Sequence, residues 1–376
     1  MTRKALKFFT TLLTLAGIAY ACQVPVFRYA LERWETDKYA LYLVTPKPLS
    51  AEQTQLAEKI IAAQDTTNFE LNSIVLEGLS ERELWQLPEI DTSITEPTLM
   101  LFAPAKTQQT KPLYTTSFTG SGFQQLVTSP VRKQLVKKLI AGTSCIWIVI
   151  HNNKPQEALA IQQDLDKHLA KIETKIEIAD AVVETDERHT IDDSTDLDDV
   201  LRSSIPLKIE FGSLILDAND PAEAAFLATL FPSGVDAVKD TSVLVPIFGR
   251  GRFLAPLPAD KVSYDTLLNG CQYLCGACSC QVKEQNPGAD LLIQEDWAKY
   301  LTAGLAVVDK ELPPLSGVAE ITDQNAPSAT PASPEQLANQ PESKPETTHT
   351  MLITLAALVL LGLIGGSIFI LRKSSQ

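Results

Sequence analysis

The chain has 376 residues, a formal net charge of −14 and a hydrophobic fraction of 45%. An acidic chain of this kind argues against nucleic-acid binding, which needs clustered lysine and arginine. We expect no nucleic-acid partner and no docking on anionic lipid surfaces. The chain has four histidines, one of them in the C-terminal segment described below, so hydrolytic chemistry based on histidine has little to draw on.

Residues 1–21 have the pattern of a secretory signal peptide. Basic residues stand at the start, an apolar run follows, and Ala19-Tyr-Ala21 is a small-x-small cleavage motif. An uncleaved N-terminal anchor is the alternative. Cys22 comes directly after this segment, so lipid attachment at its thiol is a second alternative, which the bulky Tyr20 disfavours.

The next elements alternate between helix and strand. A helix is predicted from Pro25, because Val26, Tyr29, Ala30 and Trp34 recur at helical spacing. The following pattern predicts, in order, a strand at 39–44, a helix at 50–63, strands at 69–76, 97–102 and 113–118, and a helix at 124–141.

This order, with Cys22-x-x-Pro25 at the first helix and Pro97 before a hairpin, resembles the thioredoxin fold. In that family a redox Cys-x-x-Cys opens the first long helix, and a cis proline before the third strand lies beside the active site. The resemblance implies at most one reactive thiol here, Cys22, since Pro25 replaces the second cysteine. The strand that normally precedes the first helix is missing.

Residues 144–150 are predicted to form an apolar strand in which Cys145 is a small core residue. A helix at 155–170 and a strand at 171–178 follow, which indicates a parallel β-α-β unit. The acidic stretch within 183–204 is interpreted as a linker, so that 22–182 and 205–312 form two α/β units. A calcium site is the alternative, although the spacing lacks the glycine and terminal glutamate of a helix-loop-helix calcium motif.

The second unit is predicted to contain a strand at 205–216, a helix from Asp220, and a hairpin at 243–257. The turn of this hairpin is Gly-Arg-Gly-Arg, which carries Arg250 and Arg252 at its tip. The two arginines can clamp a carboxylate or a phosphate, or can simply be exposed. A helix at 265–274 leads from the hairpin to a cysteine cluster.

Four of the six cysteines fall within ten residues: Cys271, Cys275, Cys278 and Cys280. Cysteines outside the cytoplasm tend to be oxidised, and a bridge between Cys278 and Cys280 would be strained and easily reduced. We therefore expect Cys278 and Cys280 to be the reactive pair of a thiol–disulfide redox protein, with Cys275 as the resolving thiol and Cys22 as a partner. The supporting positions are Pro97, Pro246, Arg250, Arg252 and Lys283, the last three as positive charges that lower a thiol pKa.

Two other uses of these thiols remain open. The four thiolates Cys271, Cys275, Cys278 and Cys280 can hold copper(I) or zinc. The cysteines can also form disulfides that only hold together a scaffold or surface protein, or remain as packed thiols.

Three further stretches support a family resemblance: VPVFRYALERW at 24–34, PIFGRGR at 246–252 and CSCQVKEQNPG at 278–288, followed by Asp290-Leu-Leu. In these stretches the chain resembles an uncharacterised family of exported, membrane-anchored bacterial proteins. The resemblance implies that Cys22 and the cysteine cluster belong to one structural arrangement. It does not imply a particular activity.

Residues 313–349, rich in Pro, Ser, Gln, Glu and Thr, are predicted to be a disordered tether. Residues 350–371 follow as a transmembrane helix, since 21 uncharged residues at about 1.5 Å each span the roughly 30 Å apolar layer of a bilayer. Arg372 and Lys373 then favour a cytoplasmic tail at 372–376. The sequence thus predicts a single-pass membrane protein with an α/β body in the periplasm or extracytoplasmic space, and a thiol or disulfide of another protein as its partner.

Overall fold

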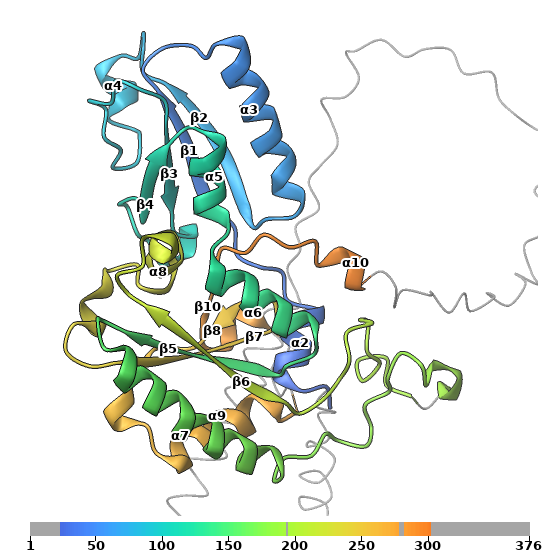
Figure 1. The fold of residues 1–376 in the computed structure, drawn as a ribbon. Helices are drawn as coiled ribbons and strands as arrows, with labels where there is room; N and C mark the ends of the chain where they lie inside the picture. The colour runs from blue at the N-terminus through green and yellow to red at the C-terminus, as the bar shows by residue number, and fades with distance from the viewer. Residues whose placement is uncertain (1–22, 193–194, 278–281, 302–376) are drawn as a thin grey trace, which may run out of the picture. The chain divides into compact units, whose positions relative to one another are not determined.

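The structure is a computed structural model that describes residues 23–192, 195–277 and 282–301. The described residues all fall within one compact unit. In this unit the chain builds two open β-sheets flanked by helices (Figure 1). The α/β class predicted from the sequence is therefore confirmed.

The first sheet has the strand order β2-β1-β3-β4. Strands β1 and β2 are parallel and joined by helix α3, whereas β3 runs antiparallel to β1 and β4 antiparallel to β3. The bounds of these elements are Tyr39–Thr45 for β1, Ala51–Ala62 for α3, Phe69–Val75 for β2, Thr98–Phe102 for β3 and Tyr114–Ser117 for β4. Each of them overlaps an element that the sequence predicts.

Helices α3 and α5 (Gly120–Val127) cover one face of this sheet. Side chains alternate along β1, and those on the covered face form a core with the helices that includes Leu41, Leu43, Ile60 and Phe123. Helix α3 begins with a capping box, in which the Ser50 hydroxyl accepts from the Gln53 backbone N–H and the Gln53 side chain accepts from the Ser50 N–H. The segment 76–97, which contains the short helix α4 (Glu81–Leu84), supplies apolar side chains to the opposite face.

The single helix predicted at 124–141 is wrong. Helix α5 ends at Val127, and a new helix, α6 (Pro130–Ile140), begins after Ser129, whose hydroxyl accepts from the Arg132 N–H at 3.3 Å. Proline is well placed in a first helical turn but ends the preceding helix. The break matters because α5 packs on the first sheet and α6 packs on the second.

The second sheet has the order β10-β8-β7-β5-β6, and β9 also pairs with β7. Strand β5 is parallel to β6 and antiparallel to β7. The bounds are Cys145–His151 for β5, Phe211–Asp217 for β6, Val243–Phe248 for β7, Arg252–Phe253 for β8, Leu257–Pro258 for β9 and Ala289–Asp290 for β10. The predicted hairpin at 243–257 is confirmed as β7 and β8.

Helices cover both faces of the second sheet (Figure 1). On one face lie α2 (Val26–Glu32), α7 (Pro155–Glu173) and α9 (Tyr264–Cys275), and on the other lie α6 and α8 (Ala224–Leu230). A short helix, α10 (Ala298–Leu301), ends the described chain. Single 3₁₀ turns occur at Ala63–Asp65, Ala105–Thr107, Arg188–Thr190, Pro221–Glu223, Val235–Val238, Ala259–Lys261 and Lys283–Gln285.

The strand predicted at 171–178 and the expected domain boundary both differ from the structure. Helix α7 continues to Glu173, and the parallel partner of β5 is β6 instead. Because β5 precedes the acidic stretch while β6 and β7 follow it, residues on the two sides of 183–204 share one sheet. The acidic stretch is therefore a crossover within one unit, and 22–182 and 205–312 are not separate units.

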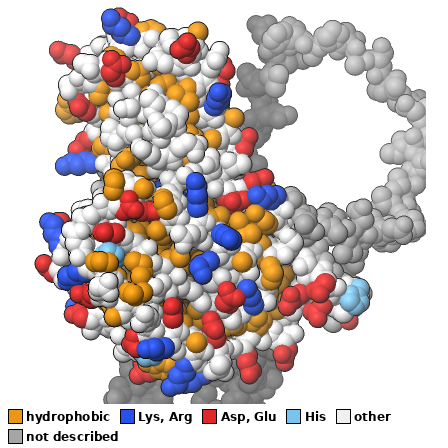
Figure 2. All heavy atoms as spheres, in the orientation of Figure 1, with side chains coloured by type: hydrophobic (Ala, Val, Ile, Leu, Met, Phe, Trp, Pro, Cys, Tyr) orange, Lys and Arg blue, Asp and Glu red, His pale blue; other side chains and the backbone are white. Residues whose placement is uncertain are grey.

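The surface that Figure 2 shows mixes acidic, basic and hydrophobic side chains, and basic and hydrophobic groups lie next to each other in the middle of this face, over α6. None of the helices in the described part of the chain has the length and apolar character needed to cross a bilayer. The predicted signal peptide (1–21), tether (313–349), membrane span (350–371) and tail (372–376) lie outside the described residues.

Candidate functional site

Three stretches that are distant in sequence meet at the C-terminal end of helix α2 and the residues just after it. They are the 24–34 segment, the Gly-Arg-Gly-Arg turn at 249–252, and the 283–290 segment. All three belong to the motifs singled out in the sequence. Their contacts show that the motifs encode one packed centre.

Helix α2 is completely buried, including its charged residues. Arg28 Nε forms an ion pair with Glu32 Oε1 at 2.7 Å, and both side chains are almost inaccessible. Burial lowers the pKa of Arg28 and raises the pKa of Glu32, although each is partly offset by the charge of the other. The cost of removing both charges from water offsets much of the attraction within a buried pair of this kind.

The charged residues of α2 and its C-terminal end hold the last part of the acidic stretch. The Glu32 carboxylate accepts from the Arg202 N–H at 2.7 Å, and Arg28 donates to the Ser203 carbonyl at 3.1 Å. Arg33 donates to the Asp198 carboxylate at 2.7 Å and to the Val200 carbonyl at 3.1 Å. These hydrogen bonds fix this end of the predicted linker to the body. Among the described residues, no group of three or more His, Cys, Asp or Glu side chains is arranged to hold a metal ion.

The Gly-Arg-Gly-Arg turn is not an exposed basic tip. Gly249 and Gly251 have positive φ values of 61° and 99°, and a Cβ on Gly249 would lie 2.8 Å from the Ala30 Cβ. The glycines therefore permit both the turn and its close approach to α2. Arg250 points back to the end of this helix, where its guanidinium donates to the carbonyls of Leu31 at 2.7 Å and Glu32 at 3.2 Å.

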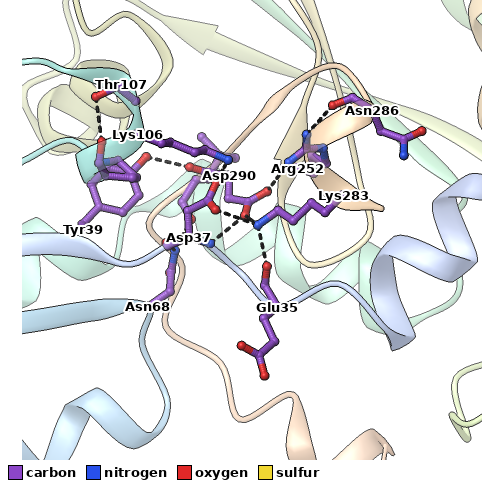
Figure 3. A network of polar contacts seen from close by, with 12 residues as sticks. Glu35, Asp37, Tyr39, Asn68, Lys106, Thr107, Arg252, Lys283, Asn286 and Asp290 are labelled. Atoms are coloured by element: carbon purple, nitrogen blue, oxygen red, sulfur yellow. Dashed lines mark hydrogen bonds and ion pairs between the residues drawn. The ribbon is translucent and has the colours of Figure 1, made fainter. Parts of the chain in front are cut away.

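Asp290 is the centre of a polar cluster that consists of Asp37, Lys106, Arg252, Lys283 and Asp290, in which Arg252, Lys283 and Asp290 are buried (Figure 3). The Asp290 carboxylate accepts from Arg252 Nη1 at 3.1 Å, from the Asp37 N–H at 2.8 Å and from Lys283 Nζ. Arg252 also donates to the carbonyls of Asn286 and Pro287, and its guanidinium lies 5.4 Å from the centre of the Trp34 ring. Arg252 does clamp a carboxylate, but the carboxylate belongs to the protein.

The polar cluster also joins the second sheet to the first. Lys283 Nζ and Lys106 Nζ both pair with the Asp37 carboxylate, just before β1. The Tyr39 hydroxyl donates to the Asp290 carbonyl at 2.7 Å, and the Asn68 amide donates to the carbonyls of Asp37 and Leu291 at 2.9 Å. These contacts tie the start of β1 and the loop before β2 to the segment that follows the cysteine cluster (Figure 3).

The structure describes both predicted supporting prolines. Pro97 precedes β3 as expected, but no peptide bond among the described residues is cis. Pro246 is buried in β7, where it lies opposite Trp147 of β5. On the other side of β7, residues 247 and 248 pair with β8 and residues 243 and 244 pair with β9, so Pro246 lies between these two pairings. This position suits a residue without an N–H donor.

The thiols of Cys145, Cys271 and Cys275 are free and buried in the core on the α2 side of the second sheet. Cys271 and Cys275 lie one turn apart on the inward face of α9. Burial, reinforced by the Glu173 charge, raises the pKa of Cys271 to about 12, despite an opposing hydrogen bond with Trp147. Burial also raises the pKa values of Cys145 and Cys275. These three are poor nucleophiles, and Cys275 is not an accessible resolving thiol.

Cys22, Cys278 and Cys280 lie outside the described residues, which resume at Gln23 after the first of them and end at Ala277 before the other two. Pro25 and Ala277 form an antiparallel β-bridge, and the Val26 N–H donates to the Gly276 carbonyl at 3.1 Å. The backbone three residues after Cys22 therefore contacts the backbone directly before Cys278. The four-thiol metal set predicted from the sequence includes two residues, Cys271 and Cys275, that are packed in the core.

The positive charges expected to activate a thiolate have other partners. Arg252 and Lys283 bind Asp290, and Arg250 binds α2. Sequence reasoning missed Asp37 and the central role of Asp290. Asp290 lies two residues after the 278–288 motif. A buried lysine and a buried arginine require a carboxylate partner, and only the fold shows that Asp290 is this partner.

The chain matches no protein-family model and no curated protein.

Proposed function

We propose that this chain is a membrane-tethered, extracytoplasmic thiol–disulfide redox protein whose reacting thiols are Cys22, Cys278 and Cys280. The observation that carries the proposal is the bridge between Pro25 and Ala277. It brings the chain that leads from Cys22 against the chain that leads to Cys278 and Cys280. The described cysteines are buried thiols with raised pKa values, which leaves the reactive role to these three.

We propose Cys22 and Cys280 as the disulfide of the oxidised form, with Cys278 as the neighbouring thiol that can exchange into it. The contact of Pro25 with Ala277 supports this pairing, because it brings together the chain segments that lead to these cysteines. Peptide mapping under non-reducing conditions distinguishes a Cys22–Cys280 disulfide from a Cys22–Cys278 disulfide.

The proposed reaction moves two electrons. A substrate thiolate attacks the Cys280 sulfur, a substrate–Cys280 disulfide forms, and the Cys22–Cys280 bond breaks with Cys22 leaving as a thiolate. A second substrate thiolate then attacks the substrate sulfur of this mixed disulfide and releases Cys280. The substrate becomes a disulfide, and the protein gains two electrons and two protons as two thiols. The reverse exchange with a disulfide of another extracytoplasmic protein returns it to the oxidised form.

The proposed scaffold includes a thioredoxin-like first sheet. Its connection, strand–helix–parallel strand followed by an antiparallel hairpin and a helix, supports this. In that fold the redox motif precedes the first long helix, which here is α3. Residues 46–50, between β1 and α3, contain no cysteine. The first sheet therefore serves as a scaffold, and the proposed redox site lies on the second sheet, next to α2 and α9.

Counting thiols in the full-length protein tests this function. Reduction is expected to add two alkylatable thiols, and Cys22→Ser is expected to abolish that gain, whereas Cys145→Ala is the matched control that keeps it. Equal thiol counts with and without reductant would overturn the proposal. A reduction potential above about −300 mV is expected for exchange, while a lower value would indicate a structural disulfide and thus a scaffold protein.

Copper(I) binding is a second candidate function. The same backbone contact between Pro25 and Ala277 supports a three-thiolate set of Cys22, Cys278 and Cys280. Copper(I) is a soft ion that thiolates select, whereas structural zinc requires four ligands and two of the predicted zinc ligands are packed in the core. Metal analysis of protein purified without oxygen decides between the candidates: one bound copper per chain supports this one, and metal-free protein with three alkylatable thiols excludes it.

A further inference from the structure

A hollow of about 370 Å³ lies beside helix α6, and its described lining includes no residue of the polar cluster. One wall is the helix face that carries Lys133, Val136, Lys137 and Ile140. These residues are three or four positions apart, so they share one side of the helix. The opposite wall is formed by Gln294 and Glu295. A volume of this size lies within the range of small-molecule sites, roughly 300–1,000 Å³.

The walls are held in place by backbone contacts. Gln294 forms a β-bridge with Thr67, and the Glu295 N–H donates to the Thr66 carbonyl at 2.7 Å. Arg132 connects the two walls, because its Nη1 donates to the Leu126 carbonyl at 2.9 Å and to the Leu292 carbonyl at 3.0 Å. The hollow is thus part of the built fold.

The charge around the hollow is positive, although the chain as a whole is acidic. Lys133 and Lys137 are exposed, and their ammonium groups have no hydrogen bond or ion pair with any described residue. The carboxylate of Glu295 is already paired with Lys299 at 2.7 Å. Glu295 therefore does not cancel the charge of the two lysines.

Arg132 adds a buried positive charge at the same place. Its side chain is 2% exposed, and its Nε and Nη2 have no hydrogen-bond partner among the described residues. Burial lowers its pKa to about 10, against the opposing charge of Glu223, so it stays protonated at neutral pH. Glu223 accepts from the Val131 N–H at 2.7 Å, at the start of α6, and does not line the hollow.

Apolar surface completes the site. Val127, Val136 and Ile140 line the hollow together with the lysines. In Figure 2 hydrophobic and basic side chains lie next to each other over this helix. The combination of an apolar wall and unpaired cations matches a molecule with a hydrocarbon chain and one acidic group.

We infer that this hollow is a binding site for a small amphipathic acid, whose hydrocarbon chain packs on Val127, Val136 and Ile140 and whose acid group lies between Lys133 and Lys137. The buried positive charge of Arg132, which also lines the hollow, strengthens the attraction for the acid group. None of the described cysteines lines the hollow, and the inference does not depend on the redox function.

Titration calorimetry with hexanoate tests the site, on the full-length chain in lipid nanodiscs and with empty nanodiscs as the blank. Hexanoate is expected to bind and hexanol to bind much more weakly. Lys133→Gln with Lys137→Gln is expected to weaken hexanoate binding by roughly tenfold, because two charge-assisted contacts are lost. The matched control, Lys59→Gln with Lys167→Gln, removes the same charge from exposed positions on α3 and α7 and is expected to change nothing.

Three outcomes would overturn the inference. They are the absence of hexanoate binding to the unmodified chain, equal affinity for hexanol and hexanoate, and equal losses in the two double variants. The last would show that only the overall charge of the protein matters.

Discussion

At the scale of single residues, Asp290 and its cationic partners decide how the two sheets are joined. Lys283 and Arg252 are both nearly inaccessible, and both donate to the Asp290 carboxylate. A lysine and an arginine in the interior require a negative partner, because an unpaired buried charge is costly. The sequence places Lys283 and Asp290 seven positions apart, but their shared contact with Asp37 is produced only by the fold.

Asp290→Asn is expected to destabilise the protein by about 3–5 kcal/mol, because it leaves the buried Arg252 without a carboxylate and Lys283 with Asp37 alone. Urea unfolding followed by circular dichroism measures this. Lys106→Ala is the matched control: it also removes a partner from the polar cluster, but its side chain is 42% exposed, and such pairs contribute only about 0–1 kcal/mol. A loss below that of Lys106→Ala would show that the cluster is not the joint between the sheets.

Asp37 predicts a dependence of stability on pH. Burial alone would raise its pKa, but hydrogen bonds from Lys106 and Lys283 outweigh burial and hold the pKa below its ordinary value of 3.8. A carboxyl group with a lowered folded-state pKa contributes stability above its unfolded-state pKa and loses it as pH falls through the folded-state pKa. Asp37→Asn is therefore expected to lower the unfolding free energy at neutral pH, with the difference shrinking below pH 3.8. A constant difference across that range, measured by urea unfolding, would contradict this account.

The buried thiols predict a pattern of alkylation. With its pKa raised to about 12, Cys271 is expected to react with iodoacetamide roughly a thousandfold more slowly than an unperturbed thiol. Cys145 and Cys275 are expected to be similarly slow, and all three are expected to react quickly in denaturant. Mass spectrometry of the native protein measures the rates; fast labelling of Cys275 would restore it as a resolving thiol.

At the scale of elements, most helices and strands could be predicted from the sequence, and the errors have physical causes. The capped helix α3 and the hairpin of β7 and β8 depend on local signals, a capping box and positive-φ glycines. The break between α5 and α6 was missed because the apolar spacing continues across Pro130. The strand predicted at 171–178 failed because β5 already has β6 and β7 as neighbours, which no local pattern shows.

Helix α2 is the element that holds the acidic stretch to the body. Arg33→Ala removes donors to Asp198 and Val200, and we expect residues 184–200 to be cleaved faster by protease and to exchange amide hydrogens faster. The control is Lys208→Ala, which removes a surface pair with Glu210. Unchanged protection of 184–200 in Arg33→Ala would show that other contacts hold this stretch.

At the scale of the whole molecule, the three sequence motifs have one structural meaning. The 24–34 segment, the Gly-Arg-Gly-Arg turn and the 283–290 segment meet at the end of α2 and the residues just after it. The first of these segments begins two residues after Cys22. The link between Cys22 and the cysteine cluster, expected from the sequence, rests on the contact of Pro25 with Ala277. The sequence predicts that Arg250, Arg252 and Lys283 lower the pKa of a thiol. It does not show that these side chains bind carboxylate and carbonyl groups of the protein, because most of those partners lie far away along the chain.

Mapping of all six cysteines by mass spectrometry under non-reducing conditions tests the central claim most directly. The account predicts a cross-linked peptide that joins Cys22 to the 278–280 segment, with Cys145, Cys271 and Cys275 recovered as thiols. A Cys22 that is unlinked, or is bonded to one of the three buried cysteines, would contradict it.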